Sequence, residues 1–197
     1  MNTLDLDSLN QASCSRLQAG AQKYRIIMDL YWKVSVEEDR EFQRQFNGFY
    51  RVRQRSSAWY AEFFALLEQL KTRNRSFGEI LREMYDRTGR LEASFASKML
   101  ATRHPEFPVI DRWVLDNLGL RLPRYGEKDK LEKVVGVYES IVTWYHEFLI
   151  TPAARQAMNR FDQLCPNCAV TPLKKVDFIL WQTRSAPDKL KRPLGDY

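Results

Sequence analysis

One aspartate, Asp111, stands where an apolar stretch ends and a helix is predicted to begin, in "EFPVIDRWV" at residues 106–114. Aspartate is a preferred helix N-cap, because its carboxylate accepts a hydrogen bond from a free N–H of the first turn. A carboxylate can also stabilise positive charge that develops on a substrate. Asp111 is therefore interpreted as a cap, as a catalytic group, or as both.

A serine and a lysine, Ser94 and Lys98, share one face of the helix predicted over about 92–102. Residues four apart lie one turn apart on the same side of a helix, and this side is opposite the apolar face. A lysine on such a face is usually only solvated. Its functional interpretation is a contact to phosphate, or a cleft amine whose pKa is lowered by burial.

Arginines alternate with aromatic residues in "FNGFYRVRQRSSAWY", which carries Arg51, Arg53 and Arg55. Guanidinium groups bind phosphates, and aromatic rings stack on bases or enter the gap that a flipped nucleotide leaves. A second basic cluster contains Arg73. Both stretches can equally be solvated loops, so they favour nucleic acid without establishing it.

Cys165 and Cys168 form a C-x-x-C pair in "DQLCPNCAV", whereas Cys14 stands alone. Zinc sites normally need four ligands, and the isolated His104 and His146 do not complete such a set. The pair is interpreted as two free thiols beside a Pro-Asn turn. We expect no metal and no cofactor.

The composition indicates a packed protein with a basic balance. Of 197 residues, 44% are hydrophobic, and 31 Lys and Arg outnumber 25 Asp and Glu to give a net charge of +6. This surplus suits an anionic partner such as nucleic acid. No apolar run approaches the roughly 18–20 residues of a membrane span, and the N-terminus lacks the pattern of a signal peptide. We expect a cytoplasmic, nucleoid-associated protein without a membrane partner.

Apolar residues recur mainly at helical spacing. "SFGEILREMYDRTG" begins with a capping box, Ser76 and Glu79, and ends at Gly89, a natural C-cap. Other helices are predicted in "WYAEFFALLEQL", "KDKLEKVVGVYESIVTWYHEFLI", "LKKVDFILWQ" and residues 24–50. The sequence predicts one compact all-α domain over 1–184, with about eight to ten helices, and a polar basic tail over 185–197.

The segment "EASFASKMLATRHPEFPVIDRWV" resembles the helix-hairpin-helix DNA glycosylase superfamily. In that family a helix, a hairpin and a second helix precede a Pro-apolar-apolar-Asp segment and a further helix. "FYRVRQRSSAWYAEFF" and "VTPLKKVDFILWQ" are similar to elements of a bacterial branch grouped by fold with 8-oxoguanine DNA glycosylase. The resemblance implies a two-lobed helical bundle, with a central hairpin lobe over about 56–125 and the N- and C-terminal segments in the other lobe.

The resemblance also implies site residues. Asp111 matches the aspartate that lies beside the sugar of a flipped nucleotide and stabilises positive charge as the base departs. The hairpin "TGRLE" and the helix start after it would bind phosphates. The DNA-binding residues expected are Arg51, Arg53, Arg55, Arg73, Arg90, Ser94 and Arg112.

A C-terminal helix supplies the aromatic residue that sandwiches the flipped base in the 8-oxoguanine branch. The resemblance therefore implies a base pocket formed by Trp181 or Phe178. Asp177 lies on the same helix and has two interpretations. It is a second carboxylate of the pocket, or an ion-pair partner of Lys174 one turn away.

Bifunctional members of the superfamily carry a lysine near the start of the second helix, which attacks the sugar. Alignment without gaps places Ser94 at that position and Lys98 one turn later. The resemblance then implies a monofunctional enzyme in which water is the nucleophile, with Lys98 able to reach the cleft.

The function expected is that of a monomeric DNA N-glycosylase that flips a damaged or modified base from duplex DNA, in DNA repair or phage defence. Two alternatives stay open. One is a non-catalytic DNA-binding module of the same fold, in which Asp111 is only a cap. The other is an all-α protein-interaction protein whose exposed aromatic residues form the interface. The identity of the base is left open.

Overall fold

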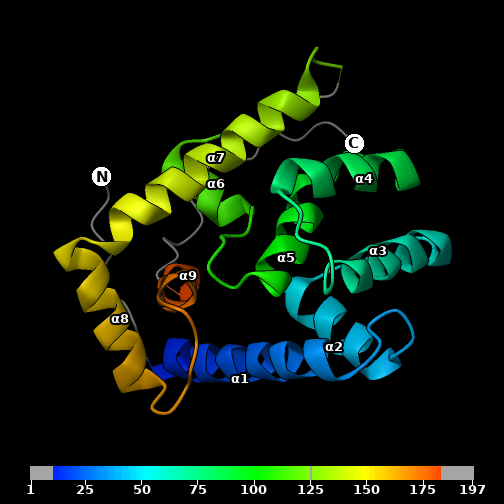
Figure 1. The fold of residues 1–197 in the computed structure, drawn as a ribbon. Coiled ribbons are helices and arrows are strands. Elements are labelled where there is room, and N and C mark those ends of the chain that lie inside the picture. Colours follow the sequence, from blue (N-terminus) through cyan, green and yellow to red (C-terminus); the bar gives the residue numbers. More distant parts are fainter. Residues whose placement is uncertain (1–10, 125, 183–197) are drawn as a thin grey trace.

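The computed structural model describes residues 11–124 and 126–182, and this part of the chain is all-helical (Figure 1). The prediction of an all-α protein with about eight to ten helices is confirmed for these residues. The predicted tail, 185–197, lies outside them. The helices are α1 (Gln11–Lys33), α2 (Arg40–Tyr50), α3 (Ser57–Gln69), α4 (Phe77–Thr88), α5 (Ala93–Arg103), α6 (Arg112–Leu118), α7 (Lys130–Leu149), α8 (Pro152–Leu164) and α9 (Pro172–Gln182).

Local signals in the sequence set several helix ends. The Ser76 hydroxyl accepts a hydrogen bond from the Glu79 N–H, and the Glu79 carboxylate accepts one from the Ser76 N–H at 2.7 Å, which completes the predicted capping box of α4. Gly89 ends α4 with a φ of 67°, in the left-handed region that glycine adopts without strain. These boundaries are confirmed.

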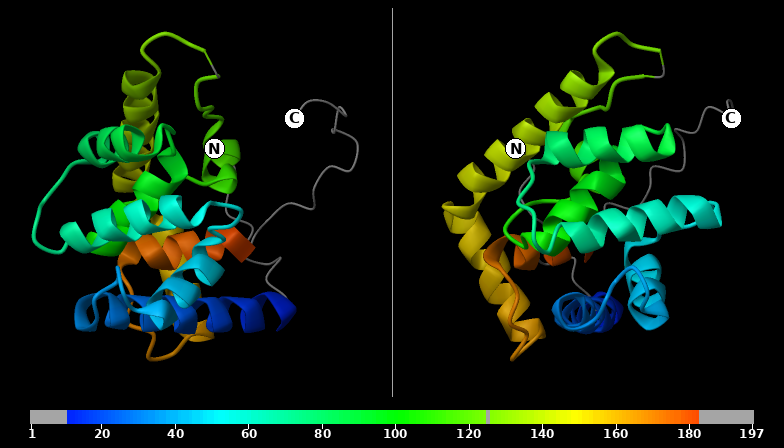
Figure 2. Two further views of the ribbon diagram at one scale, coloured as in Figure 1. Left: turned by 90° about the vertical axis from the view of Figure 1, so that its right-hand side faces the viewer. Right: turned by 45° about the vertical axis from the view of Figure 1, so that its right-hand side comes forward.

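Helix α9 lies inside the fold, where α1, α7 and α8 pack against it (Figure 1). Helix α4 contacts α3, α5 and α7, and α1 contacts α2 (Figure 2). The larger hydrophobic cluster combines residues from the C-terminal half of α1 to α9, whereas a smaller one joins the start of α1 to α8 and α9. The division into two lobes stays a prediction.

A buried ion pair anchors α9. Lys174 Nζ lies 2.8 Å from Asp177 Oδ2, one turn later, and the two side chains are only 4% and 3% exposed. The Tyr145 hydroxyl of α7 donates a hydrogen bond to the same carboxylate. Because buried charges are costly unless they are paired and hydrogen-bonded, this contact fixes the rotation of α9 against α7.

Candidate functional site

The segment before α6 is held between two helices, and this places Asp111. The Ile110 N–H donates to Ser97 Oγ of α5 at 2.8 Å, and the Tyr138 hydroxyl of α7 donates to the Pro108 carbonyl oxygen at 3.0 Å. Ile110 and its neighbour Val109 are each 1% exposed. The chain therefore enters α6 in a fixed direction, with Asp111 as its first polar residue.

Asp111 is both a cap and part of a second contact. Its Oδ1 accepts a hydrogen bond from the Val114 N–H and its Oδ2 accepts one from Trp181 Nε1, each at 2.8 Å. The predicted cap is confirmed. Burial raises the pKa of the Asp111 carboxyl, the Val114 and Trp181 hydrogen bonds oppose this, and the charge of Asp177 adds to it.

Lys98 is a poorly solvated amine close to this carboxylate. Burial lowers the pKa of Lys98 to about 8, and attraction to Asp111 and Glu92 offsets only part of this effect. Its Nζ lies 4.8 Å from the ring centre of Phe95. Within the described residues, Lys98 forms no direct ion pair. A substantial fraction of Lys98 is therefore neutral just above physiological pH.

Asp111 and Lys98 line one cavity of about 840 Å³, bounded by α1, the end of α2, α5, the start of α6 and the end of α9. This volume suits a ligand of nucleotide size. Among the lining side chains that the structure describes, Asp111 is the only carboxylate. Basic and aromatic residues surround it, namely Arg16, Lys23, Arg51, Lys98, Arg112, Phe49, Tyr50, Phe95, Trp113, Phe178 and Trp181.

Six of the seven predicted DNA-binding residues divide into two groups. Arg51, Ser94 and Arg112 line the cavity. Arg53, Arg73 and Arg90 are exposed elsewhere, so their DNA contacts stay predictions.

Arg55 is more buried than the other arginines of this set, and its guanidinium lies 3.1 Å from the Glu92 carboxylate and 5.6 Å from the ring centre of Trp59. Glu92 is the N-cap residue of α5 but makes no side-chain cap hydrogen bond. A phosphate that approached the N-terminus of α5 would meet this carboxylate. The Arg55 contact neutralises part of its charge.

The three predicted base-pocket residues occupy different environments. Trp181 and Phe178 line the cavity, although Phe178 is 2% exposed and packs in the smaller hydrophobic cluster. Trp181 is less buried, and its ring centre lies 6.0 Å from that of Phe49. Asp177 does not line the cavity; it is the ion-pair partner of Lys174, the second of its two interpretations.

Several lining residues were missed in the sequence, above all on α1. Arg16, Gly20 and Lys23 face the cavity from positions four and three residues apart, and Gly48 faces it from α2. The spacing on α1 is the available signal, but it shows only that these residues share a face. Which face of α1 turns toward the cavity depends on packing against α2 and α9.

The two ends of the described core helices meet at the cavity. Ser13, in the first turn of α1, and Gln182, the last residue of α9, both line it. Arg16 joins them, because Nε donates to the Gln182 side-chain oxygen at 3.4 Å and a terminal nitrogen donates to Ser13 Oγ at 3.2 Å.

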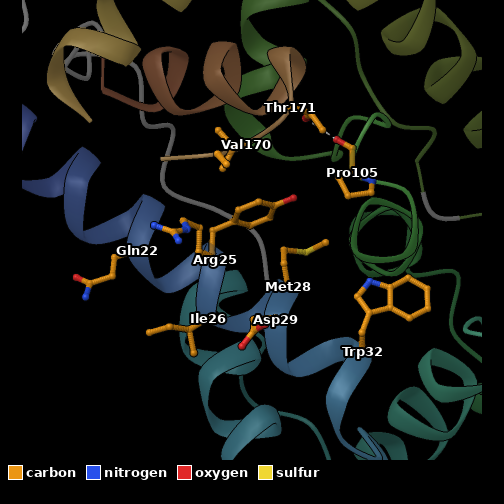
Figure 3. A pocket seen from close by; sticks show the side chains of 11 residues that line it. Gln22, Arg25, Ile26, Met28, Asp29, Trp32, Pro105, Val170 and Thr171 are labelled. Carbon is orange, nitrogen blue, oxygen red and sulfur yellow. Dashed lines mark hydrogen bonds between the residues drawn. The ribbon is translucent and has the colours of Figure 1, made fainter. Parts of the chain in front are cut away.

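A second cavity, of about 990 Å³, lies along another face of α1 (Figure 3). Arg25, Asp29 and Trp32 of α1 line it, opposite Pro105 and Thr171, where the Thr171 hydroxyl donates to the Pro105 carbonyl oxygen at 2.9 Å. Trp32 is 53% exposed. Its described lining residues include no buried carboxylate and amine comparable to Asp111 and Lys98.

Cys165 and Cys168 are free thiols on either side of a turn, closed by a hydrogen bond of 3.2 Å from the Cys168 N–H to the Cys165 carbonyl oxygen. Burial raises the pKa of Cys165 to about 11 and raises that of Cys168 as well, so both thiols are protonated near neutral pH. Among the described residues, no group of three or more His, Cys, Asp and Glu side chains is placed to hold a metal ion.

No helix of residues 11–124 and 126–182 is long and apolar enough to cross a membrane. Comparisons with protein-family models, with curated proteins and with solved structures found no match to the chain.

Proposed function

We propose that this chain is a DNA N-glycosylase of the helix-hairpin-helix type, which flips a damaged or modified base into the Asp111–Lys98 cavity and hydrolyses its N-glycosidic bond. The observation that carries the proposal is the placement of Asp111 and Lys98 in one basic, aromatic-lined cavity without a direct ion pair between them. Perturbed carboxylate and amine groups in a cavity are typical of catalytic sites.

The order of elements supports the same proposal. Helices α4 and α5 are joined by a short turn at Gly89, and the Pro108–Ile110 segment leads from α5 to Asp111 at the start of α6. This order matches the hairpin and Pro-apolar-apolar-Asp pattern on which the resemblance depends. The cations around the cavity supply the attraction for a phosphodiester backbone, since such contacts dominate affinity for DNA.

In the proposed reaction, the Asp111 carboxylate lies beside the sugar and stabilises the positive charge that grows as the bond between C1′ and the base nitrogen breaks. The oxygen of a water molecule then bonds to C1′. One water proton is transferred to the departing base nitrogen and the hydroxyl stays on the sugar. Neutral Lys98 accepts this proton from the attacking water and then passes it to the base nitrogen, which returns Lys98 to its neutral form.

One geometric feature favours the alternative of a non-catalytic DNA-binding module. Both oxygens of Asp111 already accept hydrogen bonds from Val114 and Trp181, as expected for a purely structural cap. Each carboxylate oxygen has a second lone pair, so these contacts still leave acceptor capacity toward the cavity.

The test is mass spectrometry of free bases released from a panel of oxidised, alkylated, deaminated and phage-derived duplex DNA. The wild type is compared with Asp111→Asn, and Asp116→Asn is the matched control because Asp116 is an exposed aspartate of the same helix. We expect one class of base to be released by the wild type and by Asp116→Asn but not by Asp111→Asn.

Release by none of the three proteins, with DNA binding that weakens as salt rises, would establish the binding module instead. Borohydride reduction during the reaction identifies the nucleophile. A covalent protein–DNA product that disappears in Lys98→Met would show that the amine, rather than water, attacks the sugar.

A further inference from the structure

Gly48 is a glycine that neither the backbone nor the packing of the free protein requires. It lies in the last turn of α2 and, unlike Gly89 and Gly119, does not have a positive φ. Gly48 is exposed, and a Cβ atom placed on it would meet no described atom within 4 Å beyond its chain neighbours and its own helix backbone. Because alanine stabilises a helix more than glycine does, the free protein would be at least as stable with alanine at this position.

The empty space beside Gly48 is part of the catalytic cavity. Gly48 lines the cavity together with Gly20 of the neighbouring helix α1. Gly20 has a packing reason for lacking a side chain, since a Cβ there would stand 3.3 Å from the ring of Phe178. Of these two cavity glycines, only Gly48 borders a space that no described side chain fills.

The charges near Gly48 indicate what kind of group fills this space. The last carbonyl groups of a helix carry partial negative charge, so the end of α2 disfavours a phosphate in contact with its backbone. Arg51, which follows in the C-cap position, and Arg16 and Lys23 of α1 line the same cavity and suit phosphates farther out. A flat group that carries no negative charge is the better occupant of the space itself.

The aromatic surroundings agree with a flat occupant. Phe49 follows Gly48 in α2, and its ring lies 6.4 Å from that of Phe178 and 6.0 Å from that of Trp181. Trp181 donates its indole N–H to Asp111, which fixes the ring on the cavity wall. Base rings pack readily against aromatic faces and against bare backbone.

We propose that the extruded base lies against the α2 backbone at Gly48, which makes Gly48 the residue that sets the size of base the site accepts. This subsite goes beyond the base pocket of α9 residues expected from the sequence, and it rests on the proposed function in taking a base as its occupant. Any side chain at position 48 would occupy the volume of the base.

Gly136 supplies a matched control for this proposal. It is also a helix-interior glycine, on α7, and a Cβ placed on it would likewise meet no atom within 4 Å. Gly136 lies outside the catalytic cavity. Alanine at either position should therefore raise the melting temperature, by about 1–4 °C. Only alanine at position 48 should weaken the binding of a base or nucleoside in the cavity.

The experiment is a titration of the protein with free purine and pyrimidine nucleosides, followed by the backbone amide resonances of its glycines. We expect the resonances of Gly48 and Gly20 to shift and that of Gly136 to stay in place. In Gly48→Ala the nucleoside dissociation constant should rise about tenfold, and Gly48→Leu should abolish binding, whereas Gly136→Ala and Gly136→Leu should match the wild type.

Two results would overturn the subsite: unmoved Gly48 and Gly20 resonances at saturating nucleoside, or equal nucleoside affinity in Gly48→Ala and Gly136→Ala. Failure of the glycosylase function has a different signature. If nucleosides bind at Gly48 but no DNA releases a base, the subsite stands and the proposed glycosylase activity is contradicted. If Gly48→Leu releases the base from DNA as fast as the wild type does, the subsite is contradicted and the proposed glycosylase function stands.

Discussion

Two of the lysine–aspartate pairs in this molecule lie away from bulk solvent, and these two pairs have opposite characters. Lys174 and Asp177 are in direct contact at 2.8 Å and almost wholly buried. Lys98 and Asp111 line an open cavity and attract each other electrostatically without forming a direct ion pair. The same two residue types thus stabilise a helix in one place and are available to a ligand in the other.

The pKa values of the two lysines show the physical difference. Burial alone would lower the pKa of Lys174, but the attraction and hydrogen bond of Asp177, together with Tyr50 and Tyr24, outweigh burial and raise this pKa above the ordinary lysine value. For Lys98 burial prevails, and attraction to Asp111 is too weak to compensate. Burial by itself therefore does not make a lysine reactive; burial without a contacting carboxylate does.

The largest expected effect is on stability, from removal of one lysine at a time. Lys174→Met leaves Asp177 buried without its cation, so the free energy of unfolding should fall by about 3–5 kcal/mol. Lys98→Met removes an unpaired, poorly solvated ammonium and should leave the free energy of unfolding equal or higher. Urea denaturation measures both. Equal losses of unfolding free energy in Lys174→Met and Lys98→Met would contradict the difference proposed between the two lysine–aspartate pairs.

Trp181→Phe sharpens the contrast on the aspartate side. The substitution removes the indole N–H that donates to Asp111, and a hydrogen bond to a charged group contributes about 1.5–3 kcal/mol. The pKa of Asp111 should rise further, whereas the Lys174–Asp177 pair keeps its contacts. Carboxyl carbon resonances, followed through a pH titration, report both aspartates. An unchanged Asp111 titration would show that the Trp181 contact has no influence on the carboxylate.

Alkaline pH should act on the two lysines in opposite directions. The pKa of Lys98 is about 8 in the folded protein against 10.5 for an ordinary lysine, so between these values the unfolded chain binds more protons. The free energy of unfolding should therefore rise with pH, by at most about 1.4 kcal/mol per unit, and Lys98→Met should lack this rise. The raised pKa of Lys174 gives a contribution that is complete below pH 10.5 and is lost above it.

Asp111→Asn should have the smallest effect on stability. Asparagine is also a good N-cap, but its single carbonyl oxygen cannot serve both the Val114 N–H and the Trp181 N–H. One hydrogen bond is lost, which costs about 1 kcal/mol. Thermal unfolding of Asp111→Asn and Asp177→Asn provides the measurement. We expect the free energy of unfolding to fall several times more in Asp177→Asn, because Asp177 is the more buried aspartate. A loss at position 111 as large as that at position 177 would make Asp111 chiefly a structural residue.

The local parts of this architecture could be predicted from the sequence. Ser76 and Glu79 interact across three residues, and Gly89 and Asp111 act through their own backbone neighbours, so their roles follow from short patterns. The association of Lys98 with Asp111 could also be predicted, because the two residues lie only thirteen positions apart, on either side of a proline-containing turn. Helix α8 was missed, since its buried face consists of two alanines and Phe161.

The remainder of the site depends on contacts between distant parts of the chain. Trp181 reaches Asp111 across seventy positions, and no short pattern encodes that pairing. The cavity face of α1 follows from how α1 packs between α2, α8 and α9. Asp177 shows the same limit. Helical spacing places it one turn from both Lys174 and Trp181, so the sequence allows either neighbour. Only the packing of α9 against Tyr145 shows that Asp177 belongs to the buried ion pair.

The meeting of Ser13 and Gln182 at the cavity has a practical consequence for protein engineering. A purification tag or fluorescent fusion attached close to either of these residues would begin at the cavity mouth, next to Arg16, and would compete with any large ligand. The exposed residues 126–129 before α7 do not line the cavity and offer a safer insertion point. A tag placed there leaves both ends of the core helices clear for binding experiments.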